Sequence, residues 1–360
     1  MDNRTALIAF TAIESLGPVS LGRLLALFNS PVDIWEADDS ALRAKGVNEQ
    51  TISALRAVNP EEFTDKQYAA ADKIGAKIVL SSDEEYPACL RELTDAPTTL
   101  FIQGVLPSSS SLPGIAIVGT RKPTSYGQKV AAKISSELAE AKVTVVSGYA
   151  VGIDAVAHKS AAAAGGITIA ILGCGLDHDY PAHNKTLRPH IIEKGAVITE
   201  FPFGAAPVPW HFPRRNRIVS GLSKAIAVIE AGEKSGALIT ARAALDQGRD
   251  IFSVPGPIDS SLSIGTNRLI RDGAHPLLQT SDLLLLWARH EVKRRAVQIE
   301  IPLEKNEQAL FININAEPCH IDDLAAKTNL SISSIMPILL ALEIKGVVAR
   351  HPGMCFSRAG

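Results

Sequence analysis

The middle of the chain alternates short apolar runs with amphipathic stretches. The pattern predicts strands over Ile115–Val118, Val143–Val146, Thr168–Leu172, Val197–Thr199, Ala225–Ile229 and Ile251–Val254, and helices over Ser125–Ala141, Ile153–Ala164, Asn184–Lys194, Arg214–Leu222, Ser235–Gln247 and Thr266–Arg271. Continuous apolar strands joined by helices are typical of a parallel sheet that is covered on both faces. The predicted fold class is therefore α/β, with a Rossmann-like, doubly wound parallel sheet.

The residues before this sheet read as short helices. A turn at Leu16–Ser20 places Ser20 to cap a helix over Leu21–Phe28, and a second turn precedes a helix over Glu49–Val58. Two helix–glycine–helix units resemble helix-hairpin-helix (SAM-like) modules, whose turns can hold DNA phosphates. Acidic residues surround these turns, so a compact accessory domain is the favoured interpretation.

The residues after the sheet change character again. A charged, weakly apolar linker is predicted over 291–306, and a winged-helix domain over 307–360. The predicted division is a helical domain over 1–75, a Rossmann-like domain over 76–290 with a leading extension over 76–112, the linker and the winged helix. The second helix of the wing domain, Ser333–Lys345, has no Arg, Lys, Asn or Gln before Lys345, which predicts contact with protein rather than with base edges.

Charge is segregated along the chain rather than abundant. The 360 residues carry a formal net charge of -2, so a nucleic-acid site has to come from local clusters of cations. Residues 96–136, 155–176 and 201–229 contain no Asp or Glu, and they include several Arg and Lys residues. These windows are the candidate anion-binding parts of the sequence.

The four cysteines are widely spaced and form no C-x-x-C pair. This spacing argues against a zinc site or a disulfide framework and fits a reducing compartment. The first ten residues lack the features of a signal peptide, and the apolar runs are too short to span a bilayer. We expect a cytoplasmic protein with no membrane association, no metal and no cofactor.

Small and polar residues gather where the predicted strands end. Gly119, Thr120, Arg121 and Lys122 follow the first strand and Gly148 follows the second, while Ser235 opens a later helix. In a doubly wound sheet these positions share one edge, where helix starts and glycine turns can hold phosphates. The alternative is a set of tight turns that serve only the sheet geometry, but several turns on one edge favour a site.

The most unusual stretch is Phe212-Pro213-Arg214-Arg215-Asn216-Arg217. Guanidinium groups grip phosphate oxygens and aromatic rings stack on unpaired bases, so the stretch suits single-stranded nucleic acid. A basic helix start with core aromatics is the competing interpretation, and the stretch alone leaves both open. On the first interpretation these cations line a single rim of the sheet together with Arg121.

No catalytic constellation is supported. The first turn is not G-x-G-x-x-G, and no G-x-x-x-x-G-K-[ST] run or H-E-x-x-H spacing occurs. Glu200 and Glu230 could form an acid–base pair, but we expect them to orient the arginines or to cap turns. The sequence therefore predicts a binding protein without catalytic residues.

A family resemblance is carried by a series of motifs in a fixed order. They are Val118–Arg121, Ser147–His158, Leu172–Asp177 with Tyr180-Pro181 and Asn184, Phe212–Arg217, Val228–Ala231 with Ser235–Ala241, and Val254–Gly256 with Gly265–Asn267. Together they resemble the DNA-processing protein A (DprA/Smf) family over the whole central domain. The outer regions match this family more loosely.

The resemblance implies a non-enzymatic protein of natural transformation. Such proteins bind single-stranded DNA, form a homodimer through the Rossmann-like domain and help to load the RecA recombinase. The implied nucleic-acid-binding residues are Gly119, Thr120, Arg121, Lys122, Gly148, Phe212, Arg214, Arg215, Asn216, Arg217, Ser235 and Asn267. Thr120 replaces the usual Ser and keeps its hydroxyl, whereas Val151 stands where some members carry a cation, which predicts one phosphate contact fewer.

Two other functions compete with this expectation. Nucleoside-monophosphate-cleaving enzymes share this kind of sheet, but their PGG-x-GT run is broken here by Pro257. A winged-helix transcription regulator is the other alternative, and the uncharged second helix weakens it.

Overall fold

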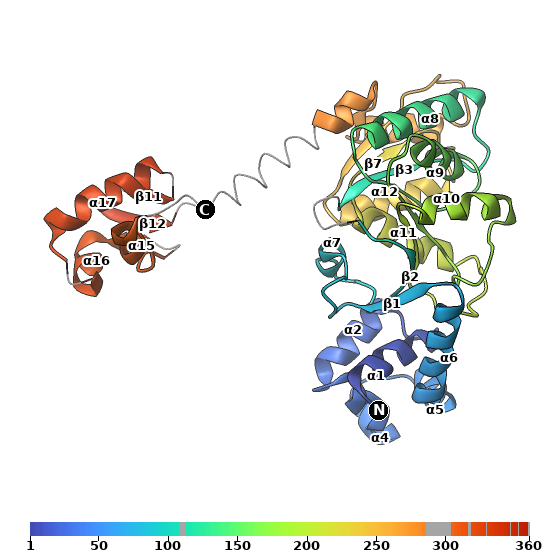
Figure 1. Cartoon of the computed structure of the whole chain (residues 1–360), viewed down its shortest axis with the longest axis horizontal. Coiled ribbons are helices and arrows are strands. Elements are labelled where there is room, and N and C mark those ends of the chain that lie inside the picture. The colour runs from blue at the N-terminus through green and yellow to red at the C-terminus, as the bar shows by residue number, and fades with distance from the viewer. Residues whose placement is uncertain are drawn as a thin grey trace. The chain divides into compact units, whose positions relative to one another are not determined.

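The computed structural model describes residues 1–107, 112–285, 304–315, 318–328, 330–345, 347–351 and 353–358. The chain divides into two compact units, Met1–Trp287 and Ala288–Gly360, and each is described here by itself (Figure 1). The predicted boundary near residue 75 falls inside the first unit and stays a prediction. Residues 291–303 of the predicted linker lie outside the described residues.

The first unit begins with a helical region that has its own core. Its elements are α1 (Asn3–Ala9), η1 (Phe10–Ala12), α2 (Pro18–Leu27), α3 (Pro31–Glu36), α4 (Asp39–Ala44), α5 (Glu49–Ala57) and α6 (Pro60–Lys73). Phe10 stacks on Trp35 at 5.0 Å between ring centroids, within a cluster of buried aliphatic side chains. The predicted cap at Ser20 is wrong, because α2 starts at Pro18, whose fixed φ suits the first position of a helix.

A nine-stranded sheet follows, in the order β1-β2-β6-β5-β4-β3-β7-β8-β9. The strands are β1 (Ala76–Leu80), β2 (Thr99–Gly104), β3 (Gly114–Val118), β4 (Val145–Ser147), β5 (Thr168–Ile171), β6 (Ala196–Thr199), β7 (Ser223–Val228), β8 (Asp250–Ser253) and β9 (His275–Pro276). β1 and β2 are antiparallel additions at one edge, and the strands from β6 to β9 pair in parallel. The predicted Rossmann-like class is confirmed, and the predicted leading extension contributes β1 and β2 to the same sheet.

Helices cover both faces of the sheet. They are α7 (Ala88–Arg91), α8 (Ser125–Glu140), α9 (Ile153–Ala163), η2 (Ala182–Leu187), α10 (Arg188–Ile192), α11 (His211–Gly221), α12 (Gly236–Asp246) and α13 (Ile264–Arg271). Ile115 and Ile117 of β3 pack with α8 and α9, whereas Ala116 and Val118 pack with α11 and α12. Successive strand residues point to opposite faces, so an entirely apolar strand is what a sheet between two helical layers requires.

The strand order reverses beside β3, and this reversal positions the candidate site. β4 pairs with one side of β3 and leads on to β5 and β6, while β7 pairs with the other side. Loops that leave neighbouring strands in opposite directions open a crevice at the carboxyl edge of the sheet. The turns after β3, β4 and β7 border this crevice.

The second unit is a small winged helix. It contains α15 (Lys305–Phe311), β10 (Cys319–His320), α16 (Ile321–Thr328), α17 (Ile332–Ile344), β11 (Val348–His351) and β12 (Cys355–Arg358), with the strands in the order β10-β12-β11. Buried aliphatic residues of its helices pack on Phe356. α15 starts within the predicted linker, at a capping box formed by Glu304 and Glu307.

The part of the chain that the structure describes holds no cluster of three or more His, Cys, Asp or Glu residues able to bind a metal ion. Within the same residues no single helix has the length and apolarity needed to cross a membrane. The bent pair α16 and α17 passes that test only jointly, by length and composition.

Candidate nucleic-acid interface

A groove of about 670 Å³ lies at the carboxyl edge of the sheet, where the strand order reverses. Its walls come from the turns after β3, β4 and β7 and from the first turns of α11 and α12. Of the predicted residues, Gly119, Thr120, Arg121, Gly148, Phe212, Arg215, Asn216 and Ser235 line it. Parallel strands bring these separate stretches of sequence to one edge, as predicted from their positions.

The groove presents a cation and aromatic rings side by side. Arg121 is exposed, and its guanidinium carbon lies 5.6 Å from the ring centroid of Phe212. Tyr180 lies 5.5 Å from Phe212 between ring centroids, and it is also exposed. A guanidinium next to partly open rings can bind a phosphate and support a stacked base at the same time.

Arg215 serves a different purpose from the one predicted. It is 5 % exposed, and its Nη1 donates to the carbonyl oxygens of Gly148 and Ile171 at the ends of β4 and β5. Burial lowers its pKa to about 10. Arg215 thus ties two strand ends together beneath the groove and adds positive charge to its floor, but it does not extend into solvent.

Gly148 is required by this internal packing. A Cβ atom there would lie 2.8 Å from Oδ2 of Asp154 and 2.9 Å from Cζ of Arg215. Asp154 is buried, and desolvation raises its pKa to about 6 against the opposing effect of the Arg215 charge. Gly119 is similar, because a Cβ there would lie 2.6 Å from Cγ1 of Ile153. Their predicted contact with nucleic acid stays a prediction, and the structure adds a packing role for each of them.

The prediction that the arginines of the Phe212–Arg217 stretch line a single rim with Arg121 is wrong for Arg214 and Arg217. Nη2 of Arg214 lies 2.9 Å from Oε2 of Glu200, and Nη2 of Arg217 lies 2.5 Å from the same oxygen. Arg217 also donates to the carbonyl oxygen of Asp95. An α-helix turns by about 100° per residue, so side chains in one such run necessarily point to different sides. Glu200 orients both arginines, as we expected of it.

Two other predicted residues lie outside the lining of the groove. Lys122 is exposed on the turn after β3, and its backbone N–H donates to the Thr120 hydroxyl. Asn267 accepts a bond of 3.1 Å from the N–H of Gly256 and donates one of 2.9 Å to its carbonyl, which fixes the turn after β8. Their predicted contact with nucleic acid stays untested by this geometry.

The expected capping role of Glu230 is confirmed. Its carboxylate accepts a hydrogen bond of 2.9 Å from the N–H of Thr124, and another from the Thr124 hydroxyl. Thr124 in turn caps α8, which starts one residue later. Glu230 therefore fastens the first turn after β3 and does not face Glu200 as an acid–base partner.

Among the groove residues that the predicted site did not include, an exposed aromatic residue and an exposed cation matter most for binding. Tyr180 and Lys234 both line the groove and both are exposed. The sequence held a signal for each, since Tyr180 is an aromatic residue in a loop that follows a strand and Lys234 immediately precedes a predicted helix start. Their proximity to Arg121 depends on the strand order, which the sequence does not specify.

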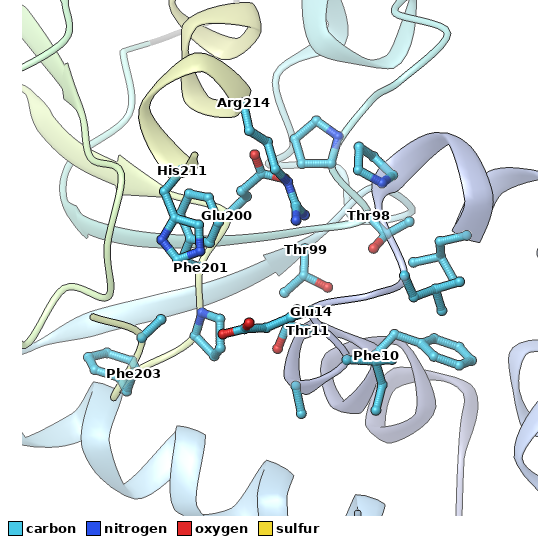
Figure 2. A pocket seen from close by; sticks show the side chains of 18 of the residues that line it. Phe10, Thr11, Glu14, Thr98, Thr99, Glu200, Phe201, Phe203, His211 and Arg214 are labelled. Atoms are coloured by element: carbon cyan, nitrogen blue, oxygen red, sulfur yellow. The ribbon is translucent and has the colours of Figure 1, made fainter. Parts of the chain in front are cut away.

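On its other side α11 borders a second cavity, of about 300 Å³, between the helical region and the sheet edge. Figure 2 shows Arg214 pointing into this cavity from α11 and Glu14 reaching in from the opposite wall. Phe201 and His211 form one side of it, with their ring centroids 3.8 Å apart.

Comparison with known proteins gives consistent matches over most of the chain. Residues 77–288 match the family of DNA recombination-mediator protein A, and residues 294–354 match the DprA winged helix domain. Protein Smf of Synechocystis is 35% identical, with 98% of each chain aligned, and protein Smf of Escherichia coli is 34% identical over 89% of this chain and 88% of its own.

Solved structures agree with these matches. The DNA processing protein A of Streptococcus pneumoniae aligns with a TM-score of 0.63 and 32% identity, covering 79% of this chain and 98% of that one. A structure that describes the single-stranded DNA binding mode of DNA processing protein A from Helicobacter pylori aligns with a TM-score of 0.53 and 28% identity, over 60% of this chain and 96% of that one.

Fold and comparisons together define a Rossmann-like protein that carries a winged helix and matches the family of DNA recombination-mediator protein A. The chain belongs to the DNA-processing protein A (DprA/Smf) family, as its motifs predicted.

Proposed function

We propose that this protein binds single-stranded DNA in the groove at the carboxyl edge of its sheet and helps to load RecA onto that strand during natural transformation. The single observation that carries the proposal is the exposed guanidinium of Arg121 beside the rings of Phe212 and Tyr180. The structure of DNA processing protein A from Helicobacter pylori, which concerns the binding of single-stranded DNA by that protein, supports the same ligand.

The groove is better suited to an unpaired strand than to a duplex. Its rings lie inside a concave edge, where only bases that have left a helix can stack on them. Arg121 and Lys234 supply exposed positive charge, and Arg215 adds buried charge below. Phosphates would bind the exposed cations, while bases stack on the rings without selection of sequence.

The test replaces Arg121 by Ala and measures binding of labelled oligo-dT at two salt concentrations. Affinity should fall about tenfold or more, because a charge-assisted hydrogen bond contributes about 1.5–3 kcal/mol. The slope of log affinity against log salt should also become shallower by about one contact. Arg23→Ala is the control, since it removes an exposed cation from α2, away from the groove.

Unchanged affinity and salt slope in the Arg121 variant would reject the groove as the DNA site. Equal losses in the Arg121 and Arg23 variants would mean that only the overall charge matters. An incubation with AMP that released free base would contradict the proposal that the protein is not an enzyme.

RecA loading and the homodimer are the finer parts of the proposal. Both rest on membership of the family and not on a contact in this chain. Loading predicts faster RecA assembly on DNA that is already coated with a single-strand-binding protein, and a homodimer predicts twice the monomer mass in light scattering. We also propose that the winged helix contacts protein, because the exposed residues of α17 include Ile332, Leu340 and Ile344.

A further inference from the structure

The first turns of α11 separate two cavities. Phe212, Pro213 and Arg215 line the groove, whereas Trp210, His211 and Arg214 line the cavity between the helical region and the sheet edge. We call this second cavity the α11 pocket. Its volume of about 300 Å³ is at the lower end for ligand sites and matches a nucleoside-sized molecule.

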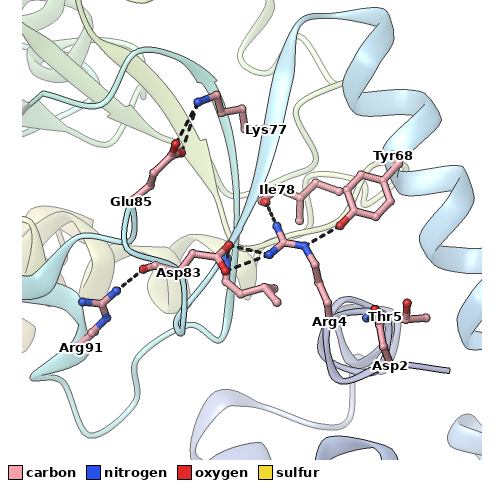
Figure 3. A network of polar contacts seen from close by, with 10 residues as sticks. Asp2, Arg4, Thr5, Tyr68, Lys77, Ile78, Asp83, Glu85 and Arg91 are labelled. Atoms are coloured by element: carbon pink, nitrogen blue, oxygen red, sulfur yellow. Dashed lines mark hydrogen bonds and ion pairs between the residues drawn. The ribbon is translucent and has the colours of Figure 1, made fainter.

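The wall of the α11 pocket that comes from the helical region is held in place. It is formed by residues near η1 and α2, and this helical region is fastened to the sheet through Arg4 (Figure 3). Arg4 donates hydrogen bonds of 3.0 and 2.9 Å to the carboxylate of Asp83, 2.8 Å to the Tyr68 hydroxyl and 2.7 Å to the carbonyl of Ile78. This wall is therefore preformed, which lowers the entropic cost of binding.

Polar groups on the walls have unused hydrogen-bonding capacity. The Glu200 side chain is 3% exposed, and its Oε1 has no hydrogen-bond donor within the described residues. Nε of Arg214 has no acceptor among the same residues, and its guanidinium lies over the Phe201 ring at 5.2 Å. Both atoms are themselves buried, whereas the Arg214 side chain is 25% exposed and points into the pocket, so the open part of its guanidinium is what a ligand would meet (Figure 2).

The charges face each other without touching. Arg214 points into the α11 pocket from one wall and Glu14 from the other (Figure 2), and no ion pair within 4.0 Å joins them in the described part of the chain. At the rim, Trp210 is 46% exposed and meets His211 edge-on at 4.1 Å between ring centroids. A flat ligand with acceptors on one edge and donors on the other would fill the space between Arg214 and Glu14.

We propose that the α11 pocket binds a guanine base. Guanine carries the acceptors O6 and N7 on one edge, and an arginine can donate hydrogen bonds to both. Its N2 amino group lies on a different edge and can donate a hydrogen bond to a carboxylate. Adenine offers its amino donor beside N7 on the edge that would face Arg214, so it cannot satisfy both walls. Stacking on Trp210 would add binding energy for either purine.

The base could come from a free nucleotide or from a DNA strand that leaves the groove over α11. The second source rests on the proposed function, and the first does not. Calorimetric titration of the full chain with dGMP and with dAMP tests the shared chemistry. We expect dGMP to bind at least about tenfold more tightly than dAMP.

Glu14→Gln should weaken dGMP binding about tenfold, because it removes the carboxylate charge that would accept from the guanine amino group. Glu14 is exposed, so the substitution should leave the fold intact. Glu36→Gln, on exposed Glu36 at the end of α3, is the matched control and should bind dGMP like the wild type. Arg121→Ala should also leave dGMP binding unchanged, since Arg121 lines the groove and not the α11 pocket.

Oligo-dT with and without one central guanine separates the two sources. Tighter binding of the guanine oligonucleotide, lost in Glu14→Gln, identifies a base of the bound strand; dGMP binding without that preference identifies a free nucleotide.

The proposal is overturned if dGMP gives no heat, if dAMP binds equally well, if Glu14→Gln has no effect, or if Arg121→Ala abolishes binding. Oligo-dT binding that persists in the absence of any dGMP binding would reject the α11 pocket and leave the proposed function standing.

Discussion

Glu200 should be one of the most sensitive positions in the first unit. Its side chain is 3% exposed, and its Oε2 pairs with Arg217, which is 8% exposed, at 2.5 Å. Replacing Glu200 by Met leaves Arg217 buried with only the carbonyl of Asp95 and a carboxylate oxygen 3.7 Å from its Nε. Removing one member of a buried pair costs about 3–5 kcal/mol.

Arg214 adds little to this cost, because it is 25% exposed and can turn towards water once Glu200 is gone. The expected loss of about 3–5 kcal/mol is a large part of the free energy of unfolding of a typical domain, about 5–15 kcal/mol. Glu200→Met with Arg217→Met should recover most of it, since two apolar side chains replace a buried ion pair at little net cost.

Urea denaturation followed by tryptophan fluorescence measures the effect in the full chain. Trp35 and Trp210 both lie in described residues of the first unit, so their fluorescence reports on its unfolding. A double-mutant cycle of Glu200→Met and Arg217→Met gives the coupling between the two side chains. A loss below about 1 kcal/mol in Glu200→Met, or additive single effects, would refute the account of a buried pair.

Two further predictions concern the groove floor. Gly148→Ala should destabilise the first unit and weaken oligo-dT binding, because its Cβ would lie 2.8 Å from Asp154 and 2.9 Å from Arg215. Gly22→Ala on α2, with no atom within 4 Å of its Cβ, should be neutral or stabilising in the same urea titration, and equal losses in both variants would contradict this explanation. Burial raises the pKa of Asp154 to about 6 in the folded protein, so the stability that its protonated form contributes is present below about pH 4 and is lost as pH rises through 6. Between pH 4 and 7 the free energy of unfolding of the wild type should therefore fall by up to about 3 kcal/mol relative to that of Asp154→Asn, at about 1.4 kcal/mol for each unit of pKa difference. A difference in unfolding free energy that stays constant across that range would show that Asp154 does not titrate there.

The central sheet was predictable because its strands are buried on both faces. The alternation of apolar runs and amphipathic helices therefore appears directly in the sequence. β9 was missed because it has only two residues, His275 and Pro276, and both are exposed. The start of α2 was misplaced because Pro18 and Ser20 are both acceptable near a helix start, and only the packed structure selects between them.

The candidate site was predictable only in part. Strand ends share one edge in any doubly wound sheet, so Arg121, Gly148 and Ser235 were found by position alone. The same reasoning failed for Arg214 and Arg217, because a run of cations in sequence does not specify which side of the helix each one occupies. It did not predict the packing role of Gly119 and Gly148, since the atoms that a Cβ would meet belong to distant residues.

The sequence by itself determined the class of fold, the family and the edge of the sheet where a ligand would bind, since local periodicity and motif order express these features. The tertiary structure alone decided which arginines face solvent, that Arg214 and Arg217 pair with Glu200, and that α11 separates a groove from a pocket. These features depend on contacts between residues far apart in the chain, and burial and pairing are properties of that three-dimensional neighbourhood.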